Sequence, residues 1–351
     1  MSAIDVGLYA LDADRQIDAL GRALRARGAA LTHVAPPSVM KLGWRVSRRL
    51  AGRSVAARMA ARAAFAEAFT AWAARRIAHA GHDVVVTDLA TAGAVRGYAR
   101  RHVLVLERGS SDAIHAALDA EVERAPAFRS HLSRYRASAA SCRREREAIA
   151  TAACVVAPSR WIARSARAAG ARHVVIAEPP APAFPWHRVD RGRRPLRIVA
   201  PGCLIGRNGA HALLECAYWM AETIHLTIAG RVADDAAAVN PYTPYFRAAG
   251  ESFEDCCREA DVVVAPWLIA GYSRDVARAR ASGIPTIATE ATGVDVEQAG
   301  VKVVREGSIE DLVGAVEGLQ CIEAREALVA GLPATPVSAA SEVALADAVM
   351  A

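Results

Sequence analysis

Short apolar runs alternate with longer helical stretches along the first half of the chain. Each run is rich in Val, Ile or Leu, and turn or helix residues border it. Continuous apolar strands separated by helices are typical of a parallel sheet that is covered on both faces. The pattern therefore predicts strands at 4–10, 31–36, 83–88, 102–107, 154–159 and 173–178.

The pattern is interrupted after residue 178 and then begins again. Four prolines between 179 and 185 precede an Arg- and Gly-rich segment without periodicity, which is typical of an interdomain linker. Beyond it, strands are predicted at 196–201, 224–230, 261–266, 284–290 and 301–305, and helices at 210–221, 253–259, 273–282, 309–319 and 338–350.

This alternation predicts an α/β fold with two Rossmann-like domains that face each other across a cleft. We expect the domains at 1–190 and 196–337, followed by a helix at 338–351 for which a return to the N-terminal domain is one interpretation. A chain of 351 residues is long enough for two such domains.

Composition narrows the environment and the chemistry. No apolar run reaches the ~18–20 residues of a spanning helix, and the first residues lack the features of a signal peptide, so the chain is interpreted as cytoplasmic. The seven cysteines are odd in number and form no CxxC pair, which argues against a disulfide framework and a zinc site. We expect neither a metal nor a cofactor.

Charge is divided unevenly between the two halves. Residues 1–195 contain 32 Lys and Arg against 16 Asp and Glu, and residues 196–351 contain 11 against 21. The halves are therefore expected to meet different partners. No RNA-binding module is recognised, so nucleic acid is not the expected partner.

The segment 41–76 holds nine basic residues and one acidic residue, with Trp44, Phe65, Phe69 and Trp72 among them. Such a segment suits an anionic membrane surface, which would make the chain a peripheral protein of the inner leaflet. In the alternative interpretation, the aromatic rings pack on the sheet and the arginines form a solvated face.

Four segments of the second half resemble one family of enzymes. They are APGCLIGRNGAHALLECA (200–217), HLTIAG (225–230), ADVVVAPWLIAGYSRDVARARASGIPTIATEATG (260–293) and VVREGSIEDLVGAVEGL (303–319). Together they resemble the donor-binding domain of the retaining B-fold glycosyltransferases, the family of lipopolysaccharide, capsule and sucrose-type transferases. The SGIP turn at 282–285 is the most specific part.

The first half resembles a subset of the same family more thinly, through ERGSS (107–111) and VVAPSRWIARSARAAGARHVVIAEPP (155–180). The resemblance implies transfer of a sugar, with retention, from a nucleotide-sugar to a polysaccharide or lipid-linked acceptor.

The chemistry of such a donor indicates candidate residues. A pyrophosphate suits backbone N–H groups at a helix N-terminus freed by a glycine turn, and guanidinium groups that bind phosphate in a bidentate manner. The candidate catalytic residues are Arg207, Arg274 and His115. The candidate donor-binding residues are Gly202, Asn208, Gly209, Gly230, Arg231, Gly271, Tyr272, Ser273 and Arg278.

On the acceptor side, four residues at the end of a predicted strand are expected to face the cleft. They are Glu107, Arg108, Ser110 and Ser111, and the alternative for the serines is a helix cap.

Several positions depart from the family's pattern. Its two glutamates around the glycine loop are Ala270 and Arg278 here, and its Arg and Lys in the first loop are Cys203 and Asn208. The glycine pair after the first strand is replaced by residues 11–14. These departures leave open a pseudoenzyme of the same fold that acts as a binding or partner subunit. A dinucleotide oxidoreductase is disfavoured, because Gly202, Gly206 and Gly209 lack GxGxxG spacing.

Overall fold

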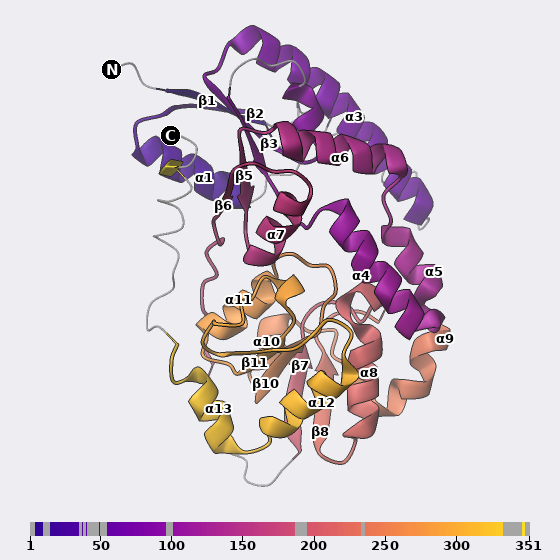
Figure 1. The fold of residues 1–351 in the computed structure, drawn as a ribbon. Coiled ribbons are helices and arrows are strands. Elements are labelled where there is room, and N and C mark those ends of the chain that lie inside the picture. The colour runs from indigo at the N-terminus through magenta and orange to yellow at the C-terminus, as the bar shows by residue number, and fades with distance from the viewer. Residues whose placement is uncertain are drawn as a thin grey trace.

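The computed structural model describes residues 4–9, 15–34, 55–95, 101–186, 195–232 and 236–332, together with 37, 40, 49, 346 and 347. The chain forms two α/β halves, one above the other in Figure 1, and each is built on a six-stranded sheet. The fold is that of two Rossmann-like units, as the sequence predicted.

The first sheet has the strand order β2-β1-β3-β4-β5-β6, and its pairings are parallel. Both faces of its central strands are buried, which explains why they appear in the sequence as continuous apolar runs. The strands are β1 (Asp5–Tyr9), β2 (Ala30–Val34), β3 (Val84–Asp88), β4 (Arg101–Val105), β5 (Cys154–Ala157) and β6 (Val174–Ile176).

The second sheet has the order β12-β11-β10-β7-β8-β9 and is also parallel. Its strand order changes direction between β7 and β10, because β7 pairs with β8 on one side and with β10 on the other. The strands are β7 (Leu196–Ala200), β8 (Ile224–Ile228), β9 (Phe246–Ala248), β10 (Val262–Ala265), β11 (Thr286–Ala288) and β12 (Val301–Val303).

Helices connect the strands in both halves. The first half contains α1 (Arg15–Ala26), α3 (Val55–Ala80), α4 (Ser111–Arg124), α5 (Arg129–Leu132), α6 (Ala139–Thr151) and α7 (Arg160–Ala168). The second contains α8 (Ala210–Trp219), α9 (Ala236–Val239), α10 (Phe253–Cys257), α11 (Arg274–Ala281), α12 (Ile309–Gly318) and α13 (Ile322–Val329). Short 3₁₀ turns are η1 (Ala92–Val95), η2 (Pro126–Phe128), η3 (Ser133–Tyr135), η4 (Gly206–Asn208), η5 (Asn240–Tyr245) and η6 (Glu290–Thr292).

One segment of the first half packs into the core of the second. The α4–η3 segment, residues 111–135, runs from the upper half toward α8 in Figure 1. Its buried side chains Ile114, Leu118, Phe128 and Leu132 belong to the same apolar cluster as the strands β7, β8 and β10. The two halves therefore share a hydrophobic core in addition to a polar contact surface.

Every strand expected from the apolar pattern is present, with ends that differ from the prediction by at most two residues. The edge strand β9, the short helix α9 and the helix α13 were not predicted. Most of the predicted helix 338–350 lies outside the described residues. Of the part that is described, Ala346 is buried in the core of the first half and Asp347 pairs with Arg27 at 2.9 Å.

The basic segment 41–76 falls partly outside the described residues, including its first tryptophan, Trp44. Within α3, Phe69 is fully buried and stacks on Trp72 with ring centroids 5.5 Å apart. Arg75 and Arg76 are exposed. These contacts match the alternative interpretation, in which the aromatic rings pack inward and the arginines face solvent.

Candidate functional site

The carboxyl ends of β10, β7 and β8 form the candidate site in the second half. Open parallel sheets bind ligands where the strand order changes direction, and here that point lies between β7 and β10. Three loops leave the sheet at this edge, at 201–209, 229–232 and 266–273.

Glycines allow these loops to pack against one another. A Cβ on Gly209, whose φ is +72°, would lie 2.0 Å from the carbonyl oxygen of Pro266. A Cβ on Gly230 would lie 2.3 Å from the carbonyl oxygen of Gly202. Side chains at these positions would separate the loops, so both predicted glycines shape this edge of the sheet.

Three arginines lie at this edge of the acidic half, two of them on these loops and the third, Arg274, at the first position of α11 directly after the loop 266–273. Arg207, Arg231 and Arg274 are exposed. Within the described part of the chain, no carboxylate lies within ion-pair distance of their guanidinium groups. The Arg207 guanidinium lies 4.8 Å from the centre of the Tyr135 ring, a cation–π contact with the first half. The sequence predicted all three as phosphate ligands, and their charge is available for an anion.

The first loop is fixed by its own side chains. Asn208 Nδ2 donates to the carbonyl oxygen of Cys203 at 2.9 Å, which holds the turn that leads into α8. Cys203 is exposed, and Trp267 lies against Gly202. The predicted residue Asn208 therefore orders the loop in this structure, and a donor contact by it stays a prediction.

The loop 271–273 is joined to two neighbours. The amides of Gly271 and Ser273 donate to the carbonyl oxygens of Ala291 and Thr292, at 2.5 and 2.6 Å. Tyr272 donates its hydroxyl to the carbonyl oxygen of Pro179 at 2.8 Å, and burial raises its pKa. Two of the amides expected to face a pyrophosphate are thus bonded within the protein.

Arg278 is also occupied by protein groups. Its guanidinium pairs with Glu254 at 2.5 Å, donates to the carbonyl oxygen of Pro182 at 3.2 Å and stacks over Phe184. These contacts bind the linker to the second half. Burial raises the pKa of Asp275 one turn earlier in α11.

The predicted acceptor-side residues form a hydrogen-bonded corner of the first half. Arg108 donates to Glu145 at 2.8 Å, and the backbone N–H and hydroxyl of Ser111 donate to the same carboxylate at 2.6 and 2.7 Å. Ser110 caps α4, as the alternative interpretation proposed. Glu107 is exposed.

His115 is a half-buried residue of α4 that holds a neighbouring loop. Its Nε2 accepts the backbone N–H of Ala137 at 3.0 Å, which assigns the proton of the neutral ring to Nδ1. This bond ties α4 to the turn before α6. A catalytic role for His115 stays a prediction.

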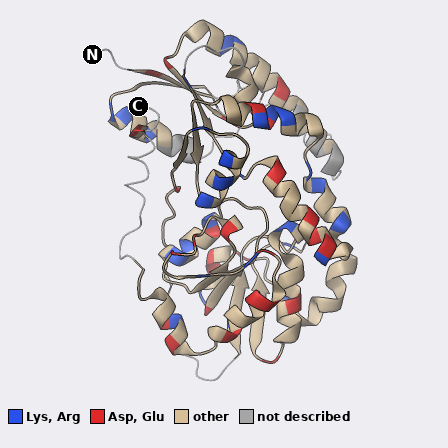
Figure 2. Ribbon diagram, viewed as in Figure 1, with Lys and Arg blue, Asp and Glu red and all other residues tan. Residues whose placement is uncertain are grey.

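Residues that the sequence did not single out join the two halves. Ser159 Oγ donates to the carbonyl oxygen of Gly271 at 2.6 Å. Arg160 pairs with Asp295 at 2.7 Å, and Arg164 pairs with Glu290. Figure 2 shows this basic face of α7 opposite acidic residues of the lower half. The basic first half and acidic second half were the available signal, but the sequence did not indicate which residues meet.

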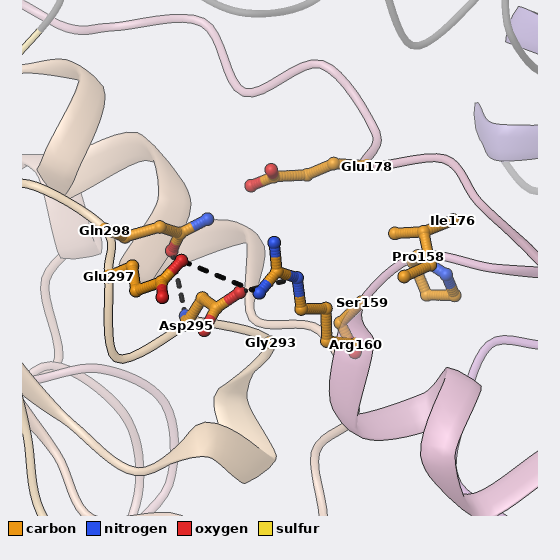
Figure 3. A pocket seen from close by; sticks show the side chains of 9 residues that line it. All are labelled: Pro158, Ser159, Arg160, Ile176, Glu178, Gly293, Asp295, Glu297 and Gln298. Carbon is orange, nitrogen blue, oxygen red and sulfur yellow. Dashed lines mark hydrogen bonds and ion pairs between the residues drawn. The ribbon is translucent and has the colours of Figure 1, made fainter.

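A cavity of about 350 Å³ opens beside these ion pairs (Figure 3). The first half contributes the start of α7 and the end of β6, and the second contributes the segment that follows η6. Its lining is formed by Pro158, Ser159, Arg160, Ile176, Glu178, Gly293, Asp295, Glu297 and Gln298.

Across the described ranges, no group of three His, Cys, Asp or Glu side chains is arranged to hold a metal ion. No helix in those ranges is long and apolar enough to cross a membrane.

Comparison with known proteins places the fold. Residues 196–321 match the model of the family "Glycosyl transferases group 1". No curated protein sequence matches the chain.

Solved structures of glycosyltransferases with this two-domain B-fold cover almost the whole chain. Sucrose-phosphate synthase from Thermosynechococcus elongatus matches with a TM-score of 0.61 and 14% identity, over 99% of this chain and 94% of that one. The catalytic domain of starch synthase IV from Arabidopsis thaliana, bound to ADP and acarbose, matches with a TM-score of 0.62 and 12% identity, over 100% of both chains. HepE from Anabaena, in complex with UDP, matches with a TM-score of 0.56 and 12% identity, over 99% and 95%.

Proposed function

We propose that this protein is a glycosyltransferase that moves a sugar of hexosyl type from a nucleotide-sugar to a hydroxyl acceptor. The observation that carries the proposal is the group of three arginines, Arg207, Arg231 and Arg274, at the strand edge where the sheet order changes direction. The half that presents them has ten more acidic than basic residues, so a local excess of guanidinium groups is a specific feature. The family match of residues 196–321 supports the same assignment.

The chemistry requires stabilisation of a leaving diphosphate. As the bond between the sugar C1 and the diphosphate oxygen breaks, negative charge grows on that oxygen, and guanidinium groups oriented beforehand lower the barrier. In the retaining course that we propose, the acceptor hydroxyl attacks C1 on the same face and its proton passes to the departing phosphate oxygen. The proposal assigns the charge stabilisation to Arg207 and Arg274 and requires no metal.

Binding of nucleoside diphosphates tests this proposal directly. We expect UDP, ADP or GDP to raise the melting temperature of the full chain. Changing Arg231 to Ala should weaken that binding about ten- to a hundredfold, since a hydrogen bond to a charged group contributes roughly 1.5–3 kcal/mol. Arg247→Ala is the matched control, because Arg247 is an exposed arginine of the edge strand β9.

The outcomes separate the alternatives. A melting temperature that no nucleoside diphosphate or nucleotide-sugar changes, in a protein shown to be folded, contradicts the proposal. Binding followed by release of nucleoside diphosphate from one nucleotide-sugar, once an acceptor is added, supports it and identifies the base.

The acceptor that we propose is a polysaccharide or a lipid-linked saccharide met at the inner face of a membrane. The exposed Arg75 and Arg76 of α3 support an electrostatic contact with anionic lipid. Since Phe69 is fully buried, insertion of that ring into the lipid has no part in the proposal.

A further inference from the structure

The cavity between α7 and residues 293–298 has two unlike walls. Pro158 and Ile176 form an apolar side, and Ile176 is 39% exposed although it is a large aliphatic residue. Opposite them in Figure 3 lie Asp295, Glu297 and Gln298, with Arg160 between the two sides. A pyranose ring has the same division, with C–H groups on one face and hydroxyl groups around its rim.

The charges of the lining disfavour anionic ligands. Three carboxylates and one guanidinium line the cavity, and the guanidinium is already paired with Asp295. Glu178 lies 3.9 Å from the guanidinium of Arg280, which is outside the lining. A phosphate or carboxylate would meet net negative charge here, whereas hydroxyl or ammonium donors would meet acceptors.

The polar wall is held in position by the backbone. Gln298 Oε1 accepts the backbone N–H of Asp295 at 3.1 Å. The side-chain Nε2 of Gln298 takes no part in this bond, so its N–H groups can donate to a ligand. The Asp295 side chain is only 14% exposed. The wall therefore offers both acceptors and a donor in a fixed arrangement, as a small-molecule site requires.

We propose that this cavity binds a sugar unit without negative charge, as the subsite for the acceptor in the reaction proposed above. The volume of about 350 Å³ falls in the lower range of small-molecule sites, which suits one or two sugar rings. The assignment of the cavity to the acceptor rests on the proposed function, whereas the preference for sugars without negative charge follows from the lining alone.

The cavity adjoins the candidate donor loop. Ser159 in its wall bonds Gly271, and a Cβ on Gly293 would lie 3.0 Å from the Cα of Tyr272. A sugar in the cavity would touch both halves of the protein. Its binding is therefore expected to stabilise the contact between them, which makes occupancy measurable without any nucleotide.

Ligand-observed NMR on the full chain tests the cavity. The probes are methyl α-glucoside and the methyl glycoside of glucosamine, compared with methyl glucuronoside and glucose 6-phosphate. We expect saturation transfer to the first two only. Ile176→Trp, which fills the cavity from an exposed position, should abolish it, and Glu297→Gln should weaken binding about tenfold.

Glu222→Gln is the matched control, since Glu222 is an exposed carboxylate in the turn before β8. Tighter binding of the two anionic sugars, equal binding to wild type and Ile176→Trp, or no binding of any probe would each overturn the proposal. Because no nucleotide is present, these results are independent of the nucleoside diphosphate test, and either proposal can fail while the other stands.

Discussion

At the scale of single residues, Glu121 is the most unusual group in the structure. Its side chain is fully buried where α4 meets the second half, and Arg124 donates to it at 2.9 Å. Within the described part of the chain, its Oε1 has no hydrogen-bond partner, and His211 Nδ1, equally unpartnered, lies 3.9 Å away. Gly307 leaves the space that the pair occupies, because a Cβ there would lie 2.1 Å from Arg124 Nη1.

Glu121 should make stability depend on pH. Burial raises its pKa above the ordinary value of 4.5, although Arg124 opposes the shift. The folded state therefore holds this proton more tightly than the unfolded chain, and the contribution present below pH 4.5 is lost as pH rises through the raised pKa. We expect Glu121→Gln to flatten the fall in the free energy of unfolding across this range, as measured by urea titrations between pH 4 and 8.

The control for this prediction is Glu123→Gln, an exposed carboxylate on the same helix. It should reproduce the pH dependence of the wild type. If Glu121→Gln has the wild-type slope as well, Glu121 is ionised in both states and the prediction is wrong. Burial lowers the pKa of the neighbouring His211.

At the scale of elements, α7 joins the two halves through polar contacts. Ser159 caps it by accepting the backbone N–H of Ile162 at 3.2 Å, and the same hydroxyl donates to Gly271. One side chain therefore caps a helix of the first half and also bonds a loop of the second half. Ion pairs from Arg160 and Arg164 extend the same contact along the helix.

Substitution of Ser159 should cost more stability than the loss of an ordinary cap. A cap contributes about 1 kcal/mol, and the buried bond to Gly271 adds roughly another 1 kcal/mol. We expect Ser159→Ala to lower the free energy of unfolding by about 2 kcal/mol in urea titrations. Ser308→Ala, which removes only the cap of α12, should cost about half as much. Equal losses would show that the bridge contributes nothing.

Elements with strong patterns were predictable, and those defined by distant contacts were not. The strand β10 is apolar throughout and β3 begins with three consecutive valines, so the type of both strands followed from the sequence. β9 has the sequence FRA at a sheet edge, too short and mixed to show a period of two. The amides of Gly271 and Ser273 were expected to be free, but they donate hydrogen bonds to the carbonyl oxygens of residues 291 and 292. That turn follows a different strand, β11, so the sequence did not indicate the contact.

The same reasoning applies to the candidate site. The glycines and arginines on the strand-end loops could be located from motif order and from the rule for parallel sheets. The cavity could not, because its walls come from residues more than 110 positions apart, and only the packing of α7 on the second half brings them together.

At the scale of the whole molecule, the basic residues of the first half lie on two different surfaces, the contact with the second half and the outer helix α3. The basic face of α7 is neutralised by Glu290 and Asp295 across the contact between the halves. On the outer helix α3, Arg75 and Arg76 are exposed, with Arg76 6.0 Å from the centre of the Trp72 ring. The positive charge available to an external anionic surface therefore includes α3.

Vesicle binding should follow this charge. We expect co-sedimentation with anionic vesicles but not with neutral ones, and a loss of binding as salt is raised. Each arginine near an anionic surface contributes about 1 kcal/mol, so the double change Arg75→Gln and Arg76→Gln should lower partitioning roughly thirtyfold. The same change at Arg247 and Arg258 in the acidic half should have no effect. Equal binding to both vesicle types would contradict the expectation.

The shared core has a consequence for how the chain is made. Leu118 and Leu132 leave the ribosome long before Leu196 or Leu226, the residues whose cluster they complete. During synthesis, the apolar side of the α4–η3 segment therefore stays exposed to solvent until the second sheet has been made. We expect the first half, released alone, to bind chaperones and aggregate, and a chimaera joined at residue 190 to fold only when both parts come from matched parents.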